Sequence, residues 1–202
     1  MASRSLAARL LAHRFLARFR SDEAGSVTVE AVIMLPILFW CFLACFVFFS
    51  AFRTQSVNVK AGYTIGDALS RETDYVTPEY MDFLFALHGV LTNTSGSRAM
   101  RLTSLRYDQK NDSYDVVWSQ GRGGVPALST RALQRMRDKI PIMADNDTAI
   151  LSETWMAYTP RFAYVGLDAF VFYDASVTRP RFAPRLCWNS VNEGGTAATA
   201  IC

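Results

Sequence analysis

The residues whose types and spacing could do chemistry lie at the entrance to a long apolar run. Gly25 and Ser26 form a pair of small residues, and Glu30 follows as a lone carboxylate. Residues 31–52 come next and contain no charged side chain. As a helix with a rise of about 1.5 Å per residue, this run would be roughly 33 Å long, enough to cross the hydrocarbon core of a bilayer. An ionisable group at the edge of such a span usually needs a partner.

Cleavage of the chain after Gly25 would supply a partner for Glu30. Ser26 would then carry the N-terminal ammonium, and Glu30 would lie four residues on, about one helical turn away. The carboxylate could pair with its own ammonium or with that of a neighbouring subunit. Pairing between subunits would fix their register, because a slip would leave a buried charge unpaired. The alternative is that Glu30 simply suits the positive end of the helix dipole.

The positive charge of the chain lies before this span. Residues 1–25 contain five arginines and two acidic residues, and their net charge of +3 equals that of the whole chain. The remainder is therefore neutral and gives no reason to expect a nucleic-acid partner. Arginine and lysine favour the cytoplasmic side of a membrane, so we expect a cytoplasmic N-terminus and an exported C-terminal domain. The run is too long for the apolar core of a cleaved secretory signal.

The helix that begins in the span is expected to continue beyond it. Apolar residues recur mostly three or four positions apart from Val57 to Leu69, which predicts one helix from near Val27 to near Arg71. Pro36 removes one backbone hydrogen bond and should bend this helix locally. Gly62 and Gly66 indicate either close packing or a bend; their positions in sequence leave both open.

The exported part shows signals of both helix and strand. Thr77-Pro78-Glu79 is a helix start. Residues 99–108 and 112–120 alternate like a β-hairpin, residues 130–140 form a short amphipathic helix, and residues 149–158 and 165–178 resemble two further strands. We therefore predict an α+β fold in which the long N-terminal helix packs on a small antiparallel sheet with two short helices. The expected divisions are a leader over 1–25, the helix over 26–72 and the exported domain over 73–202.

The four cysteines fall into two pairs. Cys41 and Cys45 lie inside the span, where they are expected to act as small apolar residues. Cys187 and Cys202 lie in the exported domain, where thiols can oxidise. A disulfide between them would hold a polar, glycine-containing tail in place, and two unpaired cysteines are the alternative.

The exported domain carries no recognisable catalytic motif. There is no HExxH, GxSxG or CxxC sequence, and the two histidines, His13 and His88, lie far apart without other metal ligands nearby in sequence. Residues 145–147 (Asp-Asn-Asp) are expected to form a turn, since the glycine and distal glutamate of a calcium loop are missing. We expect neither enzymatic activity nor a metal or cofactor.

The entrance to the span resembles a known processing signal. Gly25, four further residues, Glu30 and a long apolar helix resemble the class III signal of type IV pilins and pseudopilins. Residues 20–38 (RSDEAGSVTVEAVIMLPIL) are similar to the TadE/TadF-like minor pseudopilins of the tight adherence (Tad) pilus system. Residues 152–162 and 175–185 also resemble the paired strands and the Arg-Pro-Arg-aromatic ending of TadE-like proteins. The resemblance covers the N-terminal quarter well and the C-terminal third loosely.

This resemblance implies a function in assembling or initiating a thin adhesive pilus. It implies cleavage after Gly25 by a prepilin peptidase, a role of Glu30 in recognition or assembly, and no catalytic residue of the chain's own. The implied location is the bacterial inner membrane, with one span, a periplasmic C-terminal domain and later incorporation into a pilus. The implied partners are membrane lipid, other pilins or pseudopilins through the N-terminal helix, and the inner-membrane assembly platform.

The sequence also departs from the family's pattern. The leader is long and carries Asp22 and Glu23 beside the cut, and the polar Ser26 argues against methylation of the new N-terminus. The large exported domain argues against a major fibre subunit. Two other functions therefore stay open: a single-pass membrane protein with an exported binding domain, and a pseudopilin of a secretion or DNA-uptake system.

Overall fold

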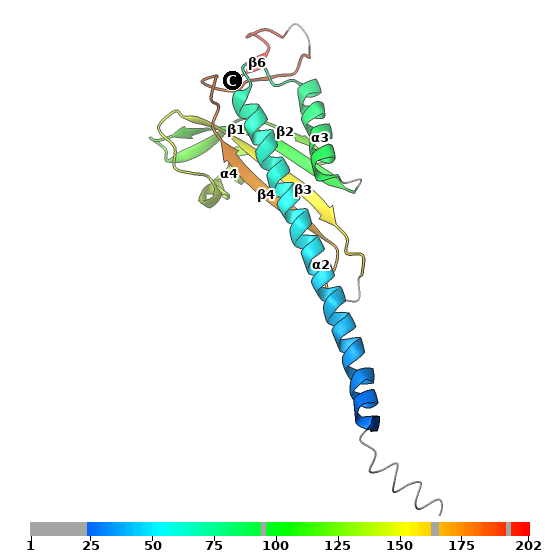
Figure 1. The fold of residues 1–202 in the computed structure, drawn as a ribbon. Helices are drawn as coiled ribbons and strands as arrows, with labels where there is room; N and C mark the ends of the chain where they lie inside the picture. Colours follow the sequence, from blue (N-terminus) through cyan, green and yellow to red (C-terminus); the bar gives the residue numbers. More distant parts are fainter. Residues whose placement is uncertain (1–23, 94–95, 163–165, 193–194) are drawn as a thin grey trace, which may run out of the picture. The chain divides into compact units, whose positions relative to one another are not determined.

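The structure is a computed structural model that describes residues 24–93, 96–162, 166–192 and 195–202 (Figure 1). It has an α+β fold, which confirms the predicted class: a long N-terminal helix, a four-stranded antiparallel sheet and short helices. The elements in chain order are α2 (Ala24–Arg71), α3 (Pro78–Thr92), β1 (Arg98–Asp108), β2 (Ser113–Arg122), α4 (Thr130–Gln134), the 3-10 helix η1 (Arg137–Lys139), β3 (Thr148–Tyr158), β4 (Phe170–Thr178), β5 (Trp188–Asn189) and β6 (Ala200–Ile201).

The chain divides into two compact units, Met1–Phe46 and Val47–Cys202. Helix α2 runs through the boundary between them and continues through Pro36 without interruption. It begins three residues earlier than the sequence predicted and ends at the predicted Arg71.

The large sheet belongs to the second unit and has the strand order β2-β1-β3-β4, with every neighbouring pair antiparallel. Strands β1 and β2 form the predicted hairpin. Their pairing contains a β-bulge, because Ser104 pairs with Trp118 while Leu105 pairs with Val116, which leaves Val117 as the extra residue. A bulge reverses the alternation of side chains between the two faces of a strand. Trp118 and Tyr114 accordingly belong to cores on opposite faces although both are even-numbered.

Each face of the sheet carries its own hydrophobic core. On one face, α2 and α3 contribute Ile65, Leu69 and Leu84, which pack with Met100 and other buried residues. On the other face, the segment between β2 and β3 covers the sheet through the buried side chains of Leu128, Leu133, Ile140 and Met143. The sheet is thus the middle layer of the second unit.

The start of α3 has the predicted N-terminal cap. The Thr77 hydroxyl accepts a hydrogen bond from the Tyr80 N–H at 3.2 Å, and Pro78 occupies the first turn. Proline is favoured there because the N–H that it lacks would have no partner within the helix. Asn93 ends the helix in the left-handed conformation, with φ of 47°.

Two sequence predictions about element boundaries were wrong, and one pair of strands was not predicted. Residues 130–140 form α4 and η1 in place of one helix, since α4 ends at Gln134 and Met136, with φ of −106° and ψ of 15°, separates the two. Ile140, which precedes Pro141, is extended and follows the end of η1. Strand β4 begins at Phe170, later than the predicted residue 165, after Gly166 with φ of +90°. The short pair β5–β6 was not predicted, since two-residue strands leave no periodic signal.

Candidate functional site

The predicted cleavage site lies at the start of α2. Gly25 and Ser26 are the second and third residues of the helix, so the peptide bond between them belongs to its first turn. The N–H groups of a first turn have no acceptors within the helix, so opening that turn breaks few hydrogen bonds. Glu30 is exposed and forms no ion pair with any residue that the structure describes.

The first half of α2 exposes an apolar surface. Val32, Leu35 and Phe42 are 64–67% exposed, and their neighbours in the uncharged run are similar. The helix is long and apolar enough to span a membrane. A continuous apolar surface of this kind is unfavourable in water, which favours burial in lipid or against other apolar helices.

The second half of α2 packs closely against β3 and β4 at two glycines. A Cβ atom on Gly62 would lie 3.3 Å from an Asp174 carboxylate oxygen, and one on Gly66 would lie 2.9 Å from the Thr178 hydroxyl oxygen. A larger side chain at either position would require the neighbouring side chain to shift. Of the two alternatives that the sequence left open for these glycines, the structure shows close packing.

A buried polar network joins α2, α3 and β3. The Asn58 side-chain amide donates to the Thr154 hydroxyl at 3.1 Å, and its oxygen lies 3.1 Å from His88 Nε2. Burial, followed by the nearby Arg98 charge, lowers the pKa of His88 to about 4. His88 is therefore neutral at physiological pH and donates from Nε2. In the sequence, this network is indicated by Asn58, a polar residue among the apolar positions of α2 that pack against the sheet.

The opposite face of the sheet buries an ion pair that sequence reasoning missed. Arg101 Nε lies 2.6 Å from Glu153 Oε2, and Arg101 Nη2 donates to Oε1 at 2.8 Å. The Tyr173 hydroxyl donates to the same Oε1 at 2.9 Å. Arg101 and Glu153 are direct neighbours in the β1–β3 register, and residues 52 positions apart in sequence give no local sign of that pairing.

The C-terminal tail is anchored by a disulfide and by backbone pairing. Cys187 and Cys202 form a disulfide, with their Cα atoms 4.5 Å apart. The Cys187 and Asn189 backbones bond to Val76, and the Trp118 indole N–H donates to the Leu186 carbonyl at 2.7 Å. Of the two alternatives for these cysteines, the structure shows the bonded pair. Cys41 and Cys45 are free and exposed on α2.

The second unit has an apolar cavity beside the end of the uncharged run. Its volume is about 200 Å³, and it is lined by Phe48, Ala51, Phe52, Gln55, Leu167, Phe170 and Phe172. Three of these residues belong to the uncharged run 31–52 itself. The apolar surface of the run therefore extends onto the start of β4.

Comparison with known proteins identifies no relatives. No protein-family model, curated protein or solved structure matches the chain. Within the described residues, no group of three or more His, Cys, Asp or Glu side chains could hold a metal ion. The features of the molecule that bear on its function are the start of α2, the exposed apolar surface of that helix and the cavities of the second unit.

Proposed function

We propose that this chain is a minor pilin or pseudopilin that takes part in assembling an adhesive pilus of the Tad type. One observation carries the proposal. A single helix, α2, exposes an uncharged apolar surface along its first half and packs into a folded α+β unit along its second half. Gly25 and Glu30 lie at its start, at the spacing of a class III pilin signal.

Each half of α2 would have a separate task in assembly. The first half would lie in the inner membrane before assembly and against the helices of other pilins afterwards, since lipid and apolar helices offer it similar surroundings. Cleavage after Gly25 would create the Ser26 ammonium, and pairing between this ammonium and Glu30 of a neighbouring subunit would select the correct register.

The second half of α2 would hold the folded unit on the polymerising helix. Gly62 and Gly66 bring the helix backbone close to the sheet, and Asn58 links it to both α3 and β3. The Cys187–Cys202 disulfide supports a periplasmic location for this unit, because disulfides persist in oxidising compartments. The arginine-rich leader supports a cytoplasmic N-terminus.

Processing is the direct test of this proposal. The full-length chain is expressed with an active prepilin peptidase and, separately, with an inactive one, and the membrane-extracted protein is analysed by intact mass and N-terminal sequencing. We expect a start at Ser26 only with the active enzyme. Gly25→Ala should block the cut, whereas Gly62→Ala, the same change within the folded unit, should leave it intact. A chain that keeps its N-terminus beside an active peptidase would refute the pilin assignment.

The role of Glu30 is tested by piliation. Glu30→Gln should leave a cleaved membrane protein that no longer supports pili, seen by electron microscopy of the host cells. Glu72→Gln, at the far end of the helix, is the matched control and should leave piliation unchanged. Normal pili in the Glu30 variant would contradict the assembly role.

A second candidate function is a single-pass membrane protein with an exported binding domain. A polar cavity on the second unit, lined by residues that include Ser104, Arg106 and Arg185, favours it, since such a cavity could serve binding without any pilus. An uncleaved N-terminus combined with ligand binding would support this function. Genes for a secretion or DNA-uptake machine beside this one would instead indicate a pseudopilin of that machine.

A further inference from the structure

A polar cavity lies on the face of the sheet that packs against α2 and α3. It is at the part of that face where the C-terminal tail, and not a helix, lies over the sheet. Met100, Leu102, Ser104 and Arg106 alternate along β1, so they share one face. The first two are buried in the core beneath α2 and α3. The last two are polar and line the cavity, together with Val117, the extra residue of the β-bulge. Bulges often re-aim side chains beside functional sites.

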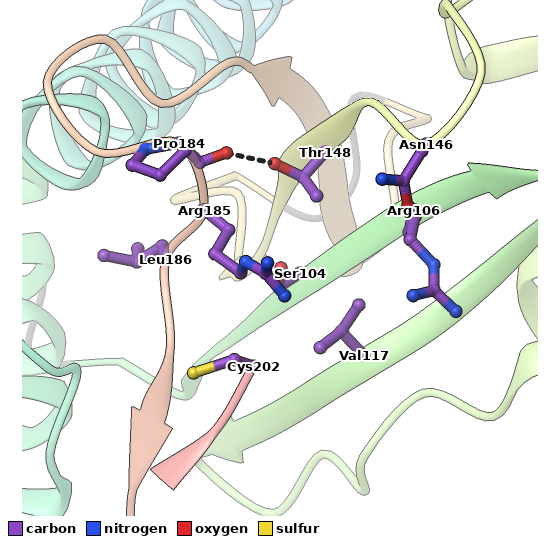
Figure 2. A pocket seen from close by; sticks show the side chains of 9 residues that line it. All are labelled: Ser104, Arg106, Val117, Asn146, Thr148, Pro184, Arg185, Leu186 and Cys202. Atoms are coloured by element: carbon purple, nitrogen blue, oxygen red, sulfur yellow. Dashed lines mark hydrogen bonds between the residues drawn. The ribbon is translucent and has the colours of Figure 1, made fainter. Parts of the chain in front are cut away.

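The C-terminal tail forms the opposite wall. Pro184, Arg185 and Leu186 pass over the sheet, and the Thr148 hydroxyl donates to the Pro184 carbonyl at 3.1 Å (Figure 2). Cys202 also lines the cavity, so the disulfide holds this wall in place. The cavity volume is about 150 Å³, enough to hold several water molecules.

The charge in this cavity is positive and uncompensated. Its two charged lining residues are Arg106 and Arg185, and neither forms an ion pair with a carboxylate in the described part of the chain. The acidic residues beside it are already engaged. Asp147 pairs with Arg179 at 2.9 Å, and Asp145 accepts the Gln109 N–H at 2.9 Å.

The cavity also offers unused hydrogen-bonding groups. Within the described residues, the side chains of Ser104, Asn146 and both cavity arginines have no hydrogen-bond partner. Figure 2 shows these side chains arranged around the same opening. Ser104 as a whole is only 2% exposed, and it lines the cavity. Donors and acceptors that face a cavity in this way are available to a ligand.

We propose that this cavity binds the carboxylate of a sugar acid such as a uronate. Guanidinium groups match a planar carboxylate, with which they form paired charge-assisted hydrogen bonds. Ser104 and Asn146 offer the donors and acceptors that sugar hydroxyls need, and Val117 and Leu186 offer apolar surface for the C–H groups of the ring. No aromatic side chain lines the cavity, so it offers no stacking surface for a nucleotide base. The inference does not depend on pilus assembly.

Titration of the purified full-length chain in detergent with glucuronate tests this proposal. Isothermal calorimetry or saturation-transfer NMR should show saturable binding, while glucose, acetate and inorganic phosphate bind at least about tenfold more weakly. Arg106→Gln and Arg185→Gln should each weaken glucuronate binding by about tenfold or more, since each removes a charge-assisted contact. Both side chains are unpaired, so both variants should keep the thermal midpoint of the parent. Arg131→Gln, which removes an exposed arginine outside the cavity, is the matched control and should bind normally.

Three results would overturn the proposal. The first is absence of saturable glucuronate binding. The second is binding that both cavity arginine variants retain at full strength, which would place the ligand elsewhere. The third is equal binding of glucose, acetate or phosphate, which would remove the assignment to a sugar acid.

Discussion

The buried ion pair between Arg101 and Glu153 makes the second unit sensitive to one small substitution, Glu153→Gln. The carboxylate is 1% exposed and the arginine 9%. Besides the two contacts with Arg101, Glu153 accepts the Tyr173 hydroxyl, and Arg101 also donates to the Pro126 carbonyl at 3.2 Å. Burial and the adjacent carboxylate raise the pKa of Tyr173, so its hydroxyl stays protonated and donating. The substitution keeps the shape of Glu153 and removes only its charge.

The expected loss follows from leaving Arg101 charged and buried without its partner. Breaking a buried pair on one side reduces the free energy of unfolding by about 3–5 kcal/mol. For a domain of about 150–250 residues, 1 kcal/mol shifts the midpoint of thermal unfolding by about 2–4 °C. We therefore expect Glu153→Gln to lower that midpoint by about 6–20 °C.

The measurement is thermal unfolding of the full-length chain in detergent, followed by near-ultraviolet circular dichroism. Trp155 reports on the site directly, because the Arg101 guanidinium lies 5.3 Å from the centre of its ring. The matched control is Asp67→Asn. Asp67 pairs with Arg71 at 2.9 Å, but the two side chains are 42% and 60% exposed. Such a surface pair should contribute about 0–1 kcal/mol.

A double variant separates the buried charge from the loss of contacts. Replacing both partners by apolar residues, as in Arg101→Met with Glu153→Leu, leaves no unpaired charge and should recover most of the stability. Equal midpoint shifts for Glu153→Gln and Asp67→Asn would refute the reasoning. So would a double variant that is less stable than Glu153→Gln alone.

Other predictions concern the helix–sheet contact and the tail. The pKa of His88 is lowered from an ordinary 6.5 to about 4 in the folded chain. Between about pH 4 and pH 6.5 the unfolded chain therefore binds more protons than the folded chain. The free energy of unfolding should therefore fall as pH drops through this window, by up to about 1.4 kcal/mol per pH unit, and His88→Gln should flatten this dependence in acid titrations. Gly66→Ala should destabilise the chain more than Gly62→Ala in thermal unfolding, since both gain the same helix propensity but only Gly66 places a Cβ within 3.0 Å of another atom. Equal effects would contradict the packing. Replacing Cys187 and Cys202 by serine opens a link between residues 15 apart and should reduce the free energy of unfolding by about 3 kcal/mol. Reduction of the parent chain should produce the same loss, and an unchanged midpoint would argue against the disulfide.

Local patterns in the sequence determined the helices and most strands. The uncharged run requires no tertiary information, because its length and composition alone set what can surround it. The Thr77 cap and the alternation along the β1–β2 hairpin are likewise local. Predictions failed where local signals were weak: the helix expected over residues 130–140 ends at Gln134, and β5 and β6 have two residues each.

Only the tertiary structure decided which polar residues meet. Asn58 and His88 are 30 positions apart, and Arg101 and Glu153 are 52 apart, so their pairing depends on helix packing and strand register. Arg106 and Arg185 reach one cavity because a bulge reshapes β2 beside it and a disulfide fixes the tail over the sheet. The sequence by itself determined the spacing of Gly25 and Glu30 at the start of the uncharged run, because that spacing lies along one helix. The cavity depends on contacts between distant segments, and only folding creates those.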